Sequence, residues 1–221
     1  MGGRVFVISG PSGSGKSTII KENRKRIDNL TYSVSHTSRR PRGAEKDGVE
    51  YHFVDRDTFR AMIDRNEFAE WAQVFQDYYG TSFCELQERT SQGLDVIMDL
   101  DVQGAVNMRL AVNDCVLVFI LPPSMEVLEE RLRARGTDDS AAVARRMERA
   151  AAEIMSARQY DFLIVNDRLD RAVEEMASII LADRCRIDRR IPEVEAVFYR
   201  GNTLRKNANF ANNKTKTPDF R

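Results

Sequence analysis

The chain has 221 residues, of which 42% are hydrophobic, so it is long enough to bury one core and to carry small inserted subdomains. Lysine plus arginine equals aspartate plus glutamate at 34 each, and this balance argues against a nucleic-acid partner or an anionic membrane. The three cysteines stand far apart in no C-x-x-C spacing, which argues against a disulfide framework and a zinc site. With no signal peptide and no apolar run near ~18 residues, we expect a cytoplasmic protein, either a monomer or a homodimer.

An apolar run at residues 5–8 predicts the first strand, and a glycine-rich loop follows it in the pattern G-x-x-x-x-G-K-[ST]. Glycines let successive backbone N–H groups turn toward a phosphate chain, with the positive end of the following helix behind them. Lys16 can then reach the β- and γ-phosphates, and the hydroxyl of Ser17 can hold Mg²⁺. The motif predicts a nucleoside triphosphate site and leaves open whether the nucleotide is a switch, a fuel or a phosphoryl donor. This site comprises Gly10, Pro11, Ser12, Gly13, Ser14, Gly15, Lys16, Ser17 and Thr18.

The helix expected after this loop departs from a regular amphipathic pattern. The spacing of Ile19, Ile20 and Ile27 would also bury Asn23 and Arg24, which are polar. We therefore expect this helix to have the least regular packing in the core.

Three further apolar runs are short and rich in β-branched or aromatic residues, which is typical of strands buried on both faces. Each is separated from the next by a span long enough for a crossover helix. The alternation of strand and helix predicts a doubly wound α/β core with a parallel sheet. The runs occupy residues 96–98, 116–121 and 162–165.

Two segments do not belong to this alternation. The first, at 35–90, is dense in charged and aromatic residues and too long for a simple connection; the second, at 126–160, is typical of two arginine-rich helices. Such insertions on a nucleotide-binding core indicate a second substrate and a moving cover. The expected apolar stripes of the two helices are Met125, Leu128 and Leu132, then Val143, Met147, Ile154 and Met155. We predict one domain at 1–200, with its core at 4–34, 91–125 and 161–185, and a polar, mobile tail at 201–221.

Seven strings beyond the phosphate loop carry a family resemblance. They are SVSHTSRRPR at 33–42, EFAEWA at 67–72, YYGTS at 78–82, DLDVQG at 99–104, LPPS at 121–124, RLRARG at 131–136 and IVND at 164–167. Over about residues 4–185 the chain resembles the guanylate kinases, nucleoside monophosphate kinases that make GDP from GMP with ATP. The resemblance implies a P-loop core, a monophosphate-binding insertion at 35–90 and a helical lid at 126–160.

The resemblance also implies a GMP site in the first insertion. Arginine offers a planar fork to phosphate oxygens, and tyrosine adds a hydroxyl donor without charge. A carboxylate can accept from the adjacent N1–H and 2-amino donors of guanine, and the resemblance gives this role to Glu70; a solvated face of a helix is the alternative for that residue. The implied phosphate ligands are Ser35, Arg39, Arg42, Tyr51 and Tyr79, and the implied guanine ligands are Glu70, Thr81 and Asp101.

Asp99 ends the run at 96–98, a position from which a carboxylate can support Mg²⁺. A continuing strand would place Asp99 and Asp101 on one face, whereas the alternative is that they cap a helix. The resemblance assigns Asn166 and Asp167 to the adenine of ATP. It assigns Arg131, Arg135 and Arg146 to the lid, while Arg145 and Arg149 are expected only to pair with glutamates one turn away.

We therefore expect an ATP-dependent enzyme that phosphorylates GMP with Mg²⁺ as cofactor. A phosphate oxygen is the attacking group, so no general base is required, and His36 and His52 are expected to be packing or loop residues. Two alternatives are a protein-interaction module that keeps the fold without catalysis and a P-loop GTPase. The intact phosphate loop argues against the first, and the lack of an N-K-x-D guanine reader argues against the second. The expected catalytic residues are Lys16, Arg42, Arg135 and Arg146.

Overall fold

The computed structural model describes residues 2–134 and 140–198, so the tail predicted at 201–221 lies outside the described residues. The chain divides into two compact units, one at 2–182 and one from 183 onward. The first unit contains both sheets, and the second contains the end of α7 (Leu169–Arg184) and α8 (Ile187–Phe198). Within the described ranges, no helix is both long and apolar enough to span a membrane.

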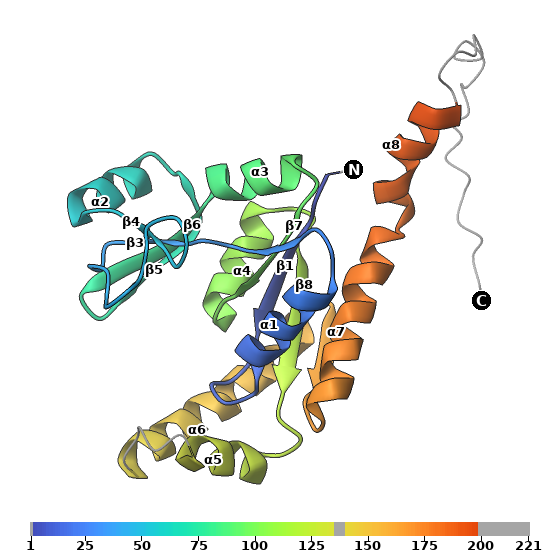
Figure 1. Ribbon diagram of the computed structural model, residues 1–221. Helices are drawn as coiled ribbons and strands as arrows, with labels where there is room; N and C mark the ends of the chain where they lie inside the picture. Colours follow the sequence, from blue (N-terminus) through green and yellow to red (C-terminus); the bar gives the residue numbers. More distant parts are fainter. Residues whose placement is uncertain (1, 135–139, 199–221) are drawn as a thin grey trace, which may run out of the picture. The chain divides into compact units, whose positions relative to one another are not determined.

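The larger sheet is fully parallel and confirms the predicted doubly wound core (Figure 1). All three strands expected after the phosphate loop are present. A short additional strand, β2, lies at one edge of the sheet and pairs with β7. The strand order is β2-β7-β1-β8-β9. In chain order the bounds are β1 Val5–Ser9, β2 Leu30–Tyr32, β7 Asp95–Asp99, β8 Val116–Leu121 and β9 Phe162–Val165.

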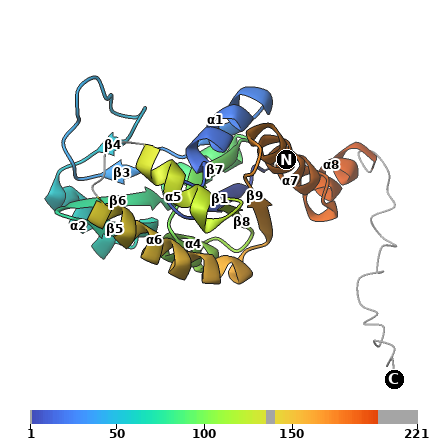
Figure 2. The ribbon, with the colours of Figure 1, turned by 90° about the horizontal axis from the view of Figure 1, so that it is seen from below.

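Helices cover both faces of this sheet, and Figure 2 shows α1 and α4 on opposite sides of β1. On one face Ile19 of α1 and Met176 of α7 pack against Phe6 and Ile8 of β1. On the other face, side chains of α3 and α4 pack against the alternate residues of the same strands. The central strands are therefore buried on both sides, as their continuous apolar runs predict. The helix bounds are α1 Lys16–Arg26, α3 Phe83–Ser91 and α4 Val102–Ala111.

The irregular position in α1 is satisfied only in part by a local hydrogen bond, since Oδ1 of Asn23 is buried without a hydrogen-bond partner in the described residues. Asn23 is fully buried, and its Nδ2 donates to the carbonyl oxygen of Ile19 at 2.9 Å, one turn earlier. Arg24 is exposed, and its guanidinium lies 5.7 Å from the centre of the Tyr32 ring. The expectation of a buried polar residue is thus confirmed for position 23 and wrong for position 24.

The first insertion forms a small sheet of order β4-β3-β6-β5 with α2 beside it. The antiparallel pair β5 and β6 is its main part, and Phe59 of α2 stacks between Phe68 and Tyr78 of that pair. These three aromatic rings give the insertion an apolar core of its own. The bounds are β3 His36–Thr37, β4 His52–Phe53, α2 Arg56–Asp64, β5 Phe68–Val74 and β6 Asp77–Ser82.

Two helices form the second insertion as predicted, α5 (Met125–Ala134) and α6 (Ser140–Met155), followed by a 3-10 turn at Ser156–Gln159. Leu128 and Leu132 of α5 pack against Val143 of α6. The apolar stripe predicted for α6 is wrong at its end, because Met155 is 72% exposed while Ala150 is buried in the cluster.

Candidate functional site

The phosphate loop connects β1 to α1 and depends on glycines for its path. Gly10 has φ of 138°, and a Cβ added there would lie 2.1 Å from the carbonyl oxygen of Ile120. Gly15 has φ of 99°, and its added Cβ would lie 2.2 Å from Nδ2 of Asn166. Both positions combine a left-handed backbone with a neighbour too close for any side chain, so the loop requires glycine at each.

Lys16 lies at the start of α1 and folds back over this loop. Its Nζ donates to the carbonyl oxygens of Gly10 at 2.5 Å and Pro11 at 3.3 Å. A pocket of about 540 Å³ opens above the loop and brings together seven of the nine predicted phosphate-loop residues, Pro11 and Ser14 being buried beneath it. The pocket is lined by Gly10, Ser12, Gly13, Gly15, Lys16, Ser17, Thr18, Asp99, Leu100, Asp101, Arg146, Arg149 and Glu153.

Residues from distant parts of the chain form hydrogen bonds that support the backbone of the phosphate loop. Nδ2 of Asn166, after β9, donates to the carbonyl oxygen of Ser14 at 2.8 Å. Nη2 of Arg131, on α5, donates to the carbonyl oxygen of Asn166 at 3.0 Å. Asp167 is exposed beside them, 3.9 Å from Arg171. Asn166 and Arg131 thus meet at the loop, and in this structure they support its backbone.

The oxygen donors at the loop fit a hydrated magnesium ion. Ser17 and Asp99 line the same pocket, and one side of the Asp99 carboxylate accepts a hydrogen bond from the hydroxyl of Tyr32. In residues 2–134 and 140–198 there is no group of three or more acidic, histidine or cysteine side chains able to hold a metal by itself. Because Mg²⁺ usually binds through one or two protein oxygens plus substrate phosphates, this donor set suits a metal that arrives with the nucleotide.

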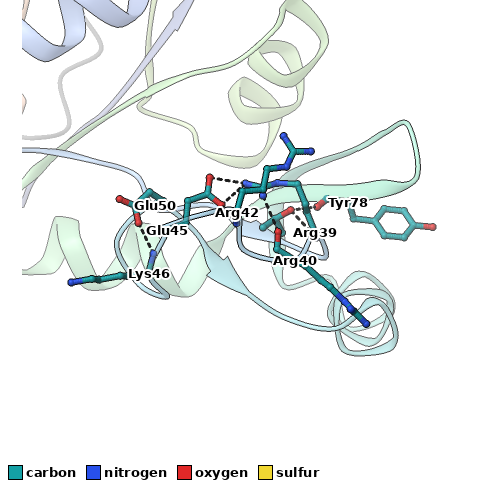
Figure 3. Close-up of polar contacts among 8 residues, drawn as sticks. Arg39, Arg40, Arg42, Glu45, Lys46, Glu50 and Tyr78 are labelled. Carbon is teal, nitrogen blue, oxygen red and sulfur yellow. Dashed lines mark hydrogen bonds and ion pairs between the residues drawn. The ribbon is translucent and has the colours of Figure 1, made fainter.

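Four of the five expected phosphate ligands, all but Ser35, lie at or beside Arg39, which is only 8% exposed. Its Nη2 donates to both carboxylate oxygens of Glu45 at 2.9 Å, and Glu45 also accepts from the backbone N–H of Arg42 at 2.8 Å (Figure 3). The ring of Tyr51 lies 5.5 Å from the Arg39 guanidinium and 5.8 Å from the ring of Tyr79. In this structure Glu45 is thus bound to Arg39, the arginine that the family resemblance assigns to the GMP phosphate.

The expected guanine ligands form a hydrogen-bonded group on the strands of the insertion. Glu70 lies on β5, so the alternative of a helical position is wrong. The hydroxyl of Thr81 on β6 donates to Oε1 of Glu70 at 2.9 Å, and Oγ of Ser35 lies 3.2 Å from the same hydroxyl oxygen. Glu70 is only 8% exposed, and burial raises its pKa to about 7. The structure joins Ser35, Thr81 and Glu70, which come from three separate strings of the sequence.

Asp101 does not continue β7. It is the N-cap of α4, where its Oδ1 accepts from the backbone N–H of Gly104 at 2.8 Å, so the helix-cap alternative is confirmed for Asp101, whereas Asp99 is the last residue of β7. A Cβ added at Gly104 would lie 3.4 Å from that Oδ1 and 3.6 Å from Oε2 of Glu70. Because Asp101 also lines the phosphate-loop pocket, the first turn of α4 joins the two expected nucleotide sites.

Helix α6 reaches this junction with two arginines. Nη1 of Arg146 lies 3.5 Å from Oγ of Ser12 in the phosphate loop. Arg149 pairs with Glu153 at 2.7 Å, as its spacing predicts, and its Nη2 also lies 3.5 Å from Oδ2 of Asp101. Arg135, the third expected lid arginine, lies outside the described residues.

Three residues of this arrangement were given no role at the site by the sequence analysis, which expected Arg149 only to pair with a glutamate one turn away. Glu45 could have been found from its place three residues after Arg42, since a turn of that length brings a side chain back onto the arginine loop. No local sequence pattern indicates the contacts that Tyr32 and Arg149 make. Each reaches an aspartate at 99 or 101 that only the assembled fold places beside it.

Comparisons with known proteins agree on one family. The family model described as guanylate kinase matches residues 2–183. The chain is similar to the guanylate kinase of Geobacter metallireducens, with 45% identity over 199 residues, covering 90% of this chain and 98% of that relative. It is 47% identical over 182 residues to the guanylate kinase of Carboxydothermus hydrogenoformans, covering 82% and 89%. The crystal structure of guanylate kinase from Anaplasma phagocytophilum matches with a TM-score of 0.68 and 29% identity, covering 90% of this chain and 96% of that one.

Proposed function

This chain belongs to the guanylate kinase family, and we propose that it transfers the γ-phosphoryl group of ATP to GMP, giving ADP and GDP. One observation carries the proposal beyond the family. The first turn of α4 places a pocket built on a phosphate loop next to a buried carboxylate, Glu70, that is suited to reading a base. A phosphoryl donor and a nucleoside monophosphate can therefore meet there.

On the donor side, backbone N–H groups of residues 10–18, apart from Pro11, hold the triphosphate, and Lys16 exchanges the carbonyl oxygens of Gly10 and Pro11 for the β- and γ-phosphates. Ser17 and Asp99 hold Mg²⁺, which neutralises charge on the phosphate oxygens when it is bound. We assign the adenine to the surface beside Asn166 and Asp167, which lies after β9 at the carboxyl edge of the sheet.

On the acceptor side, Arg39 exchanges Glu45 for the phosphate of GMP. The Glu45 carboxylate acts as a stand-in that keeps this buried guanidinium paired while the site is free. Arg42, Tyr51 and Tyr79 supply further donors, and Ser35 completes the phosphate site.

The base of GMP is read by the acidic group at the junction. Glu70 accepts from N1–H and the 2-amino group of guanine, and Thr81 fixes its carboxylate through Oε1. Asp101 completes this edge from the N-cap of α4. The Glu70 carboxylate is buried and has no ion pair among the described residues, so the donor pair of guanine would supply hydrogen bonds that favour its charged form.

Catalysis on this proposal is positioning and charge stabilisation. The attacking oxygen of GMP is ionised near neutral pH, since the second pKa of a phosphate monoester is about 6. Lys16, Arg42, Arg146 and Arg135 neutralise charge on the transferred group, and Arg131 supports the lid from α5. The insertion at 35–90 and the lid at 126–160 are thus functional parts of a single catalytic domain at 1–200.

We also propose that the enzyme works in the cytoplasm on small-molecule substrates only. The thiols of Cys84, Cys115 and Cys185 form no disulfide, which is typical of a reducing compartment. Balanced charge supports the absence of a nucleic-acid partner.

A coupled assay of ADP formation from ATP tests the function. It is run with GMP, AMP, UMP and dTMP at equal concentrations, with and without Mg²⁺. We expect rapid turnover with GMP alone and loss of turnover when Mg²⁺ is chelated. ADP formation that does not depend on GMP, or that is fastest with another monophosphate, would contradict the proposal.

A further inference from the structure

Tyr32 is the last residue of β2, at the edge of the main sheet. The parallel register sets it opposite Ile97 of β7, and Asp99 follows two residues later on the same face of β7. The phenol ring is long enough to cover that distance, and its hydroxyl donates to Oδ1 of Asp99. Among the described residues, Tyr32 is the hydrogen-bond partner of the Asp99 side chain.

The ring of Tyr32 is held in place from a third element. The guanidinium of Arg24, on α1, lies 5.7 Å from the ring centre, and the ring packs against the apolar cluster that includes Ile19 and Ile97. These contacts hold the hydroxyl of Tyr32 beside Asp99, where it is the donor of the hydrogen bond.

A carboxylate at the end of a strand can rotate about its own side-chain bonds. One anchored oxygen limits that rotation, and Asp99 lines the same pocket as Ser17 and Lys16. Hydrogen bonds of this outer-shell kind commonly change metal affinity by about 10- to 100-fold when they are removed.

We propose that Tyr32 is a positioning residue that orients the Asp99 carboxylate toward the magnesium ion accompanying the nucleotide. The inference rests on the proposed function for the metal and the phosphate loop, but not on the identity of the phosphoryl acceptor. Tyr32 touches neither nucleotide and acts only through Asp99.

Calorimetric titration with ADP separates this role from a general structural one. Each protein is titrated once with EDTA present and once with saturating Mg²⁺, and the ratio of the two affinities gives the contribution of the metal. Tyr32→Phe keeps the ring and its contact with Arg24 and removes one donor. We expect the Mg²⁺ ratio to fall about tenfold or more, while ADP affinity in EDTA stays at the parent value.

Tyr78→Phe is the matched control. It makes the same chemical change on a tyrosine that also has an arginine over its ring, Arg56 at 5.2 Å, but in the apolar core of the insertion. We expect this variant to keep the parent Mg²⁺ ratio. Asp99→Asn should abolish most of the ratio, and adding Tyr32→Phe to it should cause no further loss, because both changes act on one interaction.

Three results would overturn the proposal. The first is a Tyr32→Phe variant whose Mg²⁺ ratio equals that of the parent, and the second is a Tyr32→Phe variant that loses as much ADP affinity in EDTA as in Mg²⁺. The third is a double variant whose loss of the Mg²⁺ ratio is the sum of the losses in the two single variants. GMP takes no part in these titrations. A wrong assignment of the phosphoryl acceptor would therefore show in the coupled assay and leave this readout unaffected.

Discussion

At the scale of single residues, Lys16 carries a charge on which phosphoryl transfer is proposed to depend. Its ammonium group already sits on the carbonyl oxygens of the loop, within reach of the phosphates that the loop would hold. Replacing it in Lys16→Met removes the charge and leaves the glycine-dependent backbone intact. We expect kcat to fall by about 10²- to 10³-fold with no change in thermal unfolding.

Lys25→Met is the control for this change. Lys25 lies on the same helix, pairs with Glu22 at 2.7 Å and is exposed, so its loss should leave kcat unchanged. Near-normal turnover in Lys16→Met would contradict the assigned mechanism.

On the proposed function, Glu70 determines the choice of base. AMP offers it no N1–H and amino donor pair and would leave its carboxylate unpaired, and sites built on such hydrogen bonds reject analogues by about 10⁴- to 10⁵-fold. Glu70→Gln turns one acceptor into a donor that opposes those of guanine. We expect a far larger loss of kcat/KM for GMP than for AMP, measured by the coupled assay.

Glu67→Gln makes the same change three residues earlier, on an exposed glutamate that pairs with Arg65 at 2.5 Å. Both nucleotides should react with it as with the parent. Equal losses for GMP and AMP in Glu70→Gln would show that guanine is read elsewhere, with Thr81 and Asp101 the next residues to test.

The raised pKa of Glu70 gives GMP binding a pH dependence. Burial raises this pKa from 4.5 to about 7 in the free protein, so the carboxyl becomes protonated as the pH falls below that value and loses an acceptor for guanine. We expect KM for GMP to rise below about pH 7, approaching tenfold per pH unit. The GMP phosphate itself titrates near pH 6. Glu70→Gln should keep that phosphate component alone, and a parent profile identical to the variant's would contradict ionisation of Glu70.

At the scale of elements, the main sheet could be predicted because its central strands are covered on both faces and carry continuous apolar runs. Strand β5, which carries Glu70, could not be predicted in this way. Phe68, Ala69 and Glu70 are all buried, and the pairing register shifts between Phe68 and Glu70, so the alternation that identifies a strand is absent. What makes this segment a strand is its pairing with β6, which lies further along the chain.

The same reason limits the prediction of the site. The phosphate loop is local, and its nine residues could be assigned from spacing alone. The bond from Tyr32 to Asp99 depends on the register between β2 and β7, and β2 is only three residues long. The convergence of Glu70 and Asp101 depends on how β5 meets α4, which no local pattern encodes.

Helix α5 connects the lid to the phosphate loop. Leu132 is buried in the cluster of α5 and α6, and a Cβ added at Gly13 would lie 3.3 Å from its Cδ2, so the same leucine packs beneath the loop. Leu132→Ala should destabilise this region by about 2–5 kcal/mol. We expect faster hydrogen exchange in α5 and α6 and a rise in KM for ATP larger than that for GMP.

Leu110→Ala, on α4, is the control because Leu110 is 78% exposed. This variant should change neither the hydrogen exchange of α5 and α6 nor KM for ATP. Equal effects of Leu132→Ala on ATP and GMP would show that the cluster supports the whole first unit and has no special link to the loop.

At the scale of the whole molecule, both insertions carry arginines, and Arg146 and Arg149 of the second insertion line the phosphate-loop pocket. In the free protein, the lid helix α6 touches this pocket through Arg146 near Ser12 and Arg149 near Asp101, both at 3.5 Å. Exposed pairs of this length contribute about 0–1 kcal/mol each. Such contacts add little to the stability of α6 at this pocket, and its apolar side chains pack on α5.

ATP and GMP would change this balance, because their phosphates place several negative charges between Arg39, Arg42 and Arg146. We expect the lid and the insertion to close over the pocket when both nucleotides are bound, and to close only partly with either one. Small-angle scattering with ADP, GMP or both tests this without turnover, and the radius of gyration should be smallest with both. In Arg146→Gln the decrease should be smaller, since the guanidinium that draws α6 toward the phosphates is gone. A radius that is the same with and without both nucleotides would contradict a moving lid and would mean that the arginines are already in their working positions in the free protein.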